Sequence, residues 1–117
     1  MNTGNLLSNV GVALTLLLGL LAIGKPQVVA RFVSIKAVGF EGLSEIRATY
    51  GGFFAGIAIL AIITQSTAVF LTVGIGWLSA AMVRLASLYK GTITPKNIGG
   101  VIFESAIGTC CCAVAIF

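Results

Sequence analysis

The stretch from residue 48 to residue 83 carries no charged side chain, and it constrains the fold more than any other feature of the sequence. As a single helix it would be about 54 Å long. The hydrocarbon core of a bilayer is only about 30 Å thick, so the chain must reverse direction within this stretch. Its only polar cluster, residues 64–67, marks the turn. We therefore predict two membrane-spanning helices, over residues 44–63 and 68–89.

Two further spans flank this pair. Residues 1–24 are also free of charge, and their apolar centre predicts a helix over residues 6–23. A secretory signal peptide is the alternative, but the stretch has neither a basic start nor a small-residue cleavage site. The residue before a proline resists the helical conformation, so the chain breaks at Pro95. The last helix is then predicted over residues 96–117.

The composition excludes a soluble protein. Hydrophobic residues make up 58% of the chain and charged residues only 9%, whereas a soluble domain carries about 25% charged residues. A disordered chain is excluded by the same numbers. An open sheet cannot cross lipid, because its edge N–H and C=O groups would stay unpaired. The sequence therefore predicts an all-α fold, an integral membrane four-helix bundle that forms one domain over residues 1–117.

A short amphipathic segment lies between the first two spans. Pro26 suits the first turn of a helix, and residues 27–35 place polar and apolar side chains on opposite sides. This pattern predicts a short interfacial helix in the headgroup region, ended by Gly39 and Gly42. Ser44 is then the expected N-cap of the second span. An irregular loop with chance periodicity remains the alternative.

The basic residues lie at or near two connections, one between the first and second spans and one between the third and fourth. They are Lys25, Arg31, Lys36, Arg47, Arg84, Lys90 and Lys96. With four spans these connections lie on the same side, and the positive-inside rule places them in the cytoplasm and both termini outside. The bases form no dense cluster interleaved with aromatic residues, so we expect no nucleic-acid partner. Anionic membrane lipid is the expected partner of these charges.

Small residues recur four positions apart on several predicted helices, which places them along one helix face. Such ridges let helix backbones approach closely in a membrane. The glycines expected to act in this way are Gly52, Gly56, Gly76, Gly100 and Gly108. Two interpretations stay open. The ridges pack inside one bundle, or a leftover ridge docks another membrane protein or a second copy of the chain.

Three of the five charged residues in the predicted spans point to a buried cluster. Glu104 lies well inside the last helix, Arg84 lies one turn inside the third, and Arg47 begins the second. An isolated ion at such depth costs about 2.5–3.5 kcal/mol. We therefore predict that Arg84 or Arg47, or both, bond Glu104 inside the bundle, with Tyr50 supplying a hydroxyl. This cluster either holds the helices together or lines a polar cavity that binds an anionic headgroup or carries a proton.

Catalytic and metal-binding patterns are missing from the sequence. The chain has no histidine, and Cys110, Cys111 and Cys112 are consecutive, so on a helix they point in different directions. We expect no metal site and no cofactor, and we interpret the cysteines as small apolar filler. With no nucleophile beside a recognisable base, we expect a protein that is not an enzyme.

Residues 42–52, GLSEIRATYGG, resemble the signature of a bacterial family of small four-helix membrane proteins catalogued as domain of unknown function 4345. Members have an apolar first helix, a similar stretch before the second, an Arg in the third and an acidic residue in the fourth. Arg84 and Glu104 match the last two features here. The resemblance implies a four-helix fold in the bacterial inner membrane, and it implies that the cluster of Arg47, Tyr50, Arg84 and Glu104 matters. It implies no particular activity.

Two functions fit these expectations. The first is a non-enzymatic accessory or interaction subunit of a membrane complex, which short connections and the lack of a catalytic set favour. The alternative is a carrier or binding protein for a small solute or a lipid that uses Glu104. An enzyme acting on a lipid at the cytoplasmic interface is the third alternative.

Overall fold

The computed structural model of the chain describes residues 2–91 and 93–117. Met1 and Thr92, which the predicted domain includes, lie outside the described residues. The described residues form helices joined by short connections, with no strand among them. Four helical stretches are long and apolar enough to cross a bilayer: Thr3–Gly24, Gly39–Thr64, Thr67–Lys90 and Pro95–Ile116. The predicted all-helical class and the four candidate spans are confirmed.

The first and last helices each begin at a side-chain cap. The Asn2 side chain accepts a hydrogen bond of 2.8 Å from the backbone N–H of Asn5, which starts α1 (Thr3–Gly24) earlier than predicted. Thr94 Oγ1 accepts one of 3.1 Å from the backbone N–H of Asn97 at the start of α6 (Pro95–Ile116). Both caps satisfy N–H groups that a helix start leaves without partners.

The second span begins before Ser44, so the prediction of Ser44 as its N-cap was wrong. The span consists of α3 (Gly39–Ile46), the π-helical segment η1 (Arg47–Phe53) and α4 (Phe54–Thr64). Gly39 adopts a φ of 66°, in the left-handed region that glycine reaches without strain. Because Gly39 can turn the extended chain into a helix, this glycine starts the helix instead of ending the segment before it.

The short helix predicted between the first two spans is α2 (Pro26–Phe32), and it ends earlier than expected. Ser34 takes a φ of 62°, which is incompatible with a continuing helix. Val29 and Ala30 are buried, so part of the apolar face packs inside the protein. The Lys96 ammonium donates a 2.6 Å hydrogen bond to the backbone O of Arg31 and ties the end of α2 to the start of α6.

The turn between the second and third spans falls within the predicted polar cluster. Gln65 adopts the left-handed conformation with a φ of 49°, after which α5 (Thr67–Ser87) begins and continues into the 3₁₀ turn η2 (Leu88–Lys90). The Gln65 and Asn9 side-chain amides exchange two hydrogen bonds of 2.9 and 2.8 Å. This pair fixes the turn to α1.

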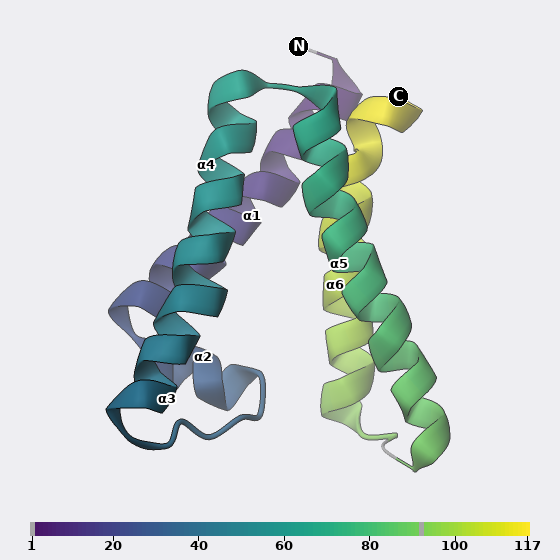
Figure 1. The fold of residues 1–117 in the computed structure, drawn as a ribbon. Coiled ribbons are helices and arrows are strands. Elements are labelled where there is room, and N and C mark those ends of the chain that lie inside the picture. The colour runs from purple at the N-terminus through teal and green to yellow at the C-terminus, as the bar shows by residue number, and fades with distance from the viewer. Residues whose placement is uncertain (1, 92) are drawn as a thin grey trace.

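The four long helices form two pairs that meet at one end and diverge toward the other (Figure 1). α4 lies beside α1, and α5 lies along α6, while α1 also packs against α6. Both termini and the turn after α4 lie at the closed end, and the connections after α2 and α5 lie at the open end (Figure 1). The arrangement is thus a splayed set of helices rather than a closed bundle. The rings of Phe54 and Trp77 stand between α4 and α5 and pack edge to face, with centroids 5.3 Å apart.

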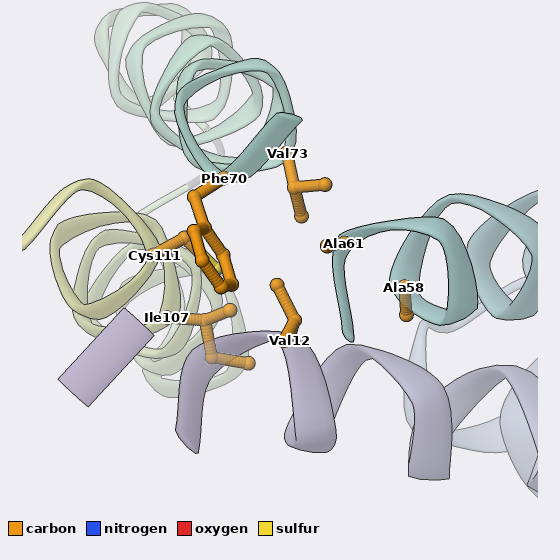
Figure 2. Close-up of a cluster of buried hydrophobic side chains, with 7 residues drawn as sticks. All are labelled: Val12, Ala58, Ala61, Phe70, Val73, Ile107 and Cys111. Atoms are coloured by element: carbon orange, nitrogen blue, oxygen red, sulfur yellow. The ribbon is translucent and has the colours of Figure 1, made fainter. Parts of the chain in front are cut away.

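A small apolar core joins all four long helices near the closed end (Figure 2). Phe70 is its largest side chain and lies among small and branched residues of α1, α4, α5 and α6. The core residues are Val12, Ala58, Ala61, Phe70, Val73, Ile107 and Cys111. Three alanine and cysteine side chains among seven keep the helices close here, which explains why the splay begins beyond the core.

Only part of the predicted glycine ridge packs inside the protein. A Cβ on Gly108 would lie 3.0 Å from the backbone O of Gly74, so α5 and α6 approach too closely there for a side chain. Gly100 makes room for a side chain of α5. In contrast, Gly56 and Gly76 face open space, and Gly52 meets only the backbone O of Arg47, at 3.9 Å. Of the two interpretations left open, packing inside the bundle therefore does not apply to these three glycines, since their helix faces point away from it.

Candidate functional site

An ion pair between α5 and α6 forms the centre of the candidate site. Arg84 Nε lies 2.8 Å from Glu104 Oε1, and Arg84 Nη2 lies 3.2 Å from Oε2, so the guanidinium fork and the carboxylate meet through two hydrogen bonds. The Glu104 side chain is 11% exposed and that of Arg84 is 36% exposed. The Glu104 carboxylate is thus enclosed by the protein. The Arg84 guanidinium is covered on the side that faces Glu104, and its other side is exposed.

The glycine one turn before Glu104 makes this geometry possible. A Cβ on Gly100 would lie 2.9 Å from both Cδ and Nε of Arg84, so the arginine side chain lies directly over the bare backbone of α6. Any larger residue at this position would push the guanidinium away from Glu104. Gly100 and Glu104 are spaced by one helical turn and therefore share a face. At Gly100 the predicted small-residue ridge therefore makes room for the charged side chain of Arg84 and not for the backbone of a second helix.

A hollow of about 450 Å³ lies beside the ion pair. Its lining comes from α5 and the first half of α6: Ala80, Val83, Arg84, Ser87, Asn97 and Glu104. Arg84 is the only cation in this lining, and a guanidinium presents five N–H donors. The described hydrogen bonds of Arg84 use Nε and one N–H of Nη2. The other N–H groups, two on Nη1 and one on Nη2, lie on the side of the guanidinium that faces away from Glu104.

A row of aromatic rings crosses the protein next to this hollow. Phe32 of α2 packs edge-on against Phe103 of α6, with centroids 5.7 Å apart, and Phe103 packs against Trp77 at 6.1 Å. Trp77 contacts Phe54, and Phe54 contacts Tyr50 at 5.8 Å. The row thus joins α2, α6, α5 and the second span. It separates the apolar core at the closed end from the charged, splayed end.

The structure does not bring Arg47 to the ion pair. Its side chain is exposed, and it stands at the start of η1, on the helix pair that diverges from α5 and α6 (Figure 1). The prediction of Arg47 as a member of a buried cluster was therefore wrong. Tyr50 lies nearer, within range of an electrostatic interaction with Arg84. Among the described residues its hydroxyl makes no hydrogen bond, and its ring packs on Phe54 instead.

The π-helical segment was not expected from the sequence. It spans Arg47–Phe53 and so contains most of the stretch that resembles the family signature. A π segment adds a residue to the helical turn, and such segments are frequent at functional sites. Gly51 lies against α1 within it, where a Cβ would be 3.2 Å from the backbone N of Ile23. The consecutive glycines at 51 and 52 are the one sequence signal for this irregularity.

Two buried hydroxyls near the core were also missed. Ser8 Oγ donates a 2.8 Å hydrogen bond to the backbone O of Cys111 and accepts one of 2.9 Å from the N–H of Val114. Thr15 Oγ1 accepts a 3.0 Å hydrogen bond from the indole N–H of Trp77. These contacts tie α1 to α6 and to α5. A hydroxyl in an apolar run was the available signal, because a polar group in lipid needs a partner.

The cysteine triplet serves helix packing. Cys111 is fully buried, and its sulfur occupies the space where a Cβ on Gly11 would stand, 2.6 Å away. Cys110 and Cys112 are half-buried, and all three thiols are free. Within residues 2–91 and 93–117, no group of three His, Cys, Asp or Glu side chains could hold a metal ion.

In comparisons with known proteins, no family model, no curated protein and no solved structure matches the chain. The resemblance of residues 42–52 to a small four-helix family therefore stays a prediction.

Proposed function

We propose that the chain is a non-enzymatic integral membrane protein of the bacterial inner membrane that acts as an accessory or interaction subunit of a membrane complex. In this proposal the basic, splayed end faces the cytoplasm, and both termini lie outside. The positive-inside rule supports the orientation, since the connections that carry most of the bases lie at one end (Figure 1). The partner is another membrane protein or a second copy.

The observation that carries the proposal is the outward orientation of Gly56 on α4 and Gly76 on α5. A Cβ at either position meets no atom of the protein within 4 Å. Glycine in a helix interior costs about 0.5–1 kcal/mol relative to alanine. Neither glycine makes a close helix contact inside the chain that would offset this cost. A helix from a partner could approach the bare backbone at these positions closely.

The mass of the protein after mild detergent extraction from its own membrane tests this role. We expect a species heavier than one chain, and we expect G56L and G76L to weaken it while leaving the helical content unchanged. G24L is the matched control, since Gly24 also faces open space but lies at the end of α1. A lone monomer for the unaltered chain would contradict the proposal.

A second candidate is a carrier or binding protein for a small solute or a lipid. The hollow that Arg84 and Glu104 line together favours it, because a buried ionisable residue in a membrane span that borders an open space can contact a ligand. If Glu104 exchanges a proton during transport, E104Q abolishes proton-coupled uptake into vesicles. Unchanged uptake by E104Q would remove Glu104 from such a mechanism.

A further inference from the structure

The open side of Arg84 faces the hollow at a depth suited to lipid headgroups. Arg84 precedes Lys90, the last residue of the third span, by six positions, which corresponds to about 9 Å along a helix. The charge therefore sits within about two turns of the basic end of the protein. At such a depth a guanidinium reaches the phosphate layer of the adjacent leaflet.

We propose that this hollow holds the phosphate of one anionic phospholipid from the leaflet at the basic end, with an acyl chain of that lipid lying along Trp77 and Phe103. The inference deepens the second candidate function and names its ligand class.

The chemistry of Arg84 favours a phosphate. Its Nε and Nη2 groups already bind Glu104, so the guanidinium is fixed in one orientation before a ligand arrives. The donors on its other side keep the planar fork that matches phosphate oxygens. Glu104 is enclosed, with 11% of its side chain exposed, while Arg84 is 36% exposed. The cation of the pair therefore faces the hollow more than the anion does.

In this proposal the aromatic row, whose rings lie outside the lining of the hollow, contacts the apolar part of the lipid. Trp77 and Arg84 lie seven positions apart on α5, which places them two turns apart on the same face. Phe103 directly precedes Glu104 on α6 and contacts Trp77 with a centroid distance of 6.1 Å. A lipid with its phosphate at Arg84 would therefore bring its first acyl carbons to these rings. The site thus has a charged end and an apolar end in the order that a leaflet lipid requires.

Charge also argues against a second copy as the occupant. A second chain in the same orientation would bring its own basic end to this level, and the chain carries seven Lys and Arg residues against three acids. Like charges brought together in this way repel, whereas an anionic headgroup neutralises them. A basic residue that lies against an anionic headgroup favours that lipid by about five-fold in binding.

Trp77 makes the proposal measurable, because it is the only tryptophan of the chain and lies in the proposed site. The full-length protein is reconstituted into vesicles that contain either brominated phosphatidylglycerol or brominated phosphatidylcholine, and bromine quenching of Trp77 fluorescence reports the lipid beside it. We expect phosphatidylglycerol to bind about five-fold more tightly than phosphatidylcholine. In R84Q this ratio falls to about one, and in R47Q, the matched arginine substitution at an exposed position, it is unchanged.

A second variant keeps the test decisive if R84Q does not fold. Ala80 lines the hollow and is exposed, so A80L fills the space while leaving the ion pair in place. We expect A80L to abolish the preference as well. Equal quenching by the two lipids in the unaltered protein, or a preference that survives in A80L, overturns the proposal. So does an R47Q variant that loses the preference as completely as R84Q, since this would reflect general surface charge. None of these outcomes depends on the mass of the extracted complex or on transport.

Discussion

The ion pair between Arg84 and Glu104 predicts an unequal response to removal of its two members. In R84Q the Glu104 carboxylate, 11% exposed, stays enclosed without its cation. Removal of one partner of a buried pair costs about 3–5 kcal/mol, and we expect about 3 kcal/mol here because Arg84 is partly solvated. In E104Q the amide oxygen still accepts a hydrogen bond, and the 36% exposed guanidinium can turn to the hollow. The expected cost is then about 1.5 kcal/mol.

The free energy of unfolding of each variant is measured in mixed micelles by titration with a denaturing detergent, followed by circular dichroism. R47Q serves as the control, and it should cost less than about 0.5 kcal/mol because Arg47 is exposed. The double variant R84Q/E104Q should lose less free energy of unfolding than the sum of the losses in the two single variants, because it contains no unpaired charge. The reasoning is refuted if E104Q costs as much as R84Q, or if R84Q behaves like R47Q.

Four further substitutions test the helix contacts, each by the same unfolding titration. G74A places a Cβ 2.9 Å from a backbone oxygen of α6 and should cost about 1–3 kcal/mol. G76A on the same helix meets no atom and should stabilise the chain, separated from any partner, by about 0.5–1 kcal/mol; equal effects would show that α5 packs through a different face. S8A removes two hydrogen bonds to the backbone of α6 and should cost about 1–3 kcal/mol, and no change would mean that water replaces the hydroxyl. T15V removes the acceptor for the Trp77 indole N–H and should cost about 1 kcal/mol, a loss that an unaltered unfolding midpoint would contradict.

The number of helices and the position of the turn could be predicted because they depend on length and polarity alone. An apolar stretch too long for one span must turn, and residues 64–67 were its only polar cluster. Glu104 and Arg84 were placed together by a similar argument, since an ion in a span needs a partner. The structure brings these two together at 2.8 Å.

The faces of the helices could not be predicted in the same way. In a soluble helix the apolar stripe marks the inside, but these spans are apolar on all sides, so the pattern of Gly52, Gly56 and Gly76 does not show which face is covered. The π segment Arg47–Phe53 also changes which face of the second span each later residue occupies. An extra residue in a turn rotates the following side chains relative to a straight α-helix.

The splay explains the error about Arg47. Sequence spacing places a residue along its own helix and gives no distance to a neighbouring one. The sequence placed Arg47 in one cluster with Glu104. In the structure Arg47 lies on the helix pair that diverges from α5 and α6 (Figure 1), and the rings of Phe54 on α4 and Trp77 on α5 meet between the two pairs, with centroids 5.3 Å apart.

The topology of the chain in its membrane tests the central claim most directly. Single cysteines are introduced as K36C, Q65C and K90C in a chain whose three native cysteines are replaced by alanine, and a membrane-impermeant maleimide is applied to intact and to permeabilised spheroplasts. All three positions are exposed. The account predicts that Q65C reacts in intact spheroplasts, while K36C and K90C react only after permeabilisation. Reaction of K36C and K90C from opposite sides of the membrane would contradict it.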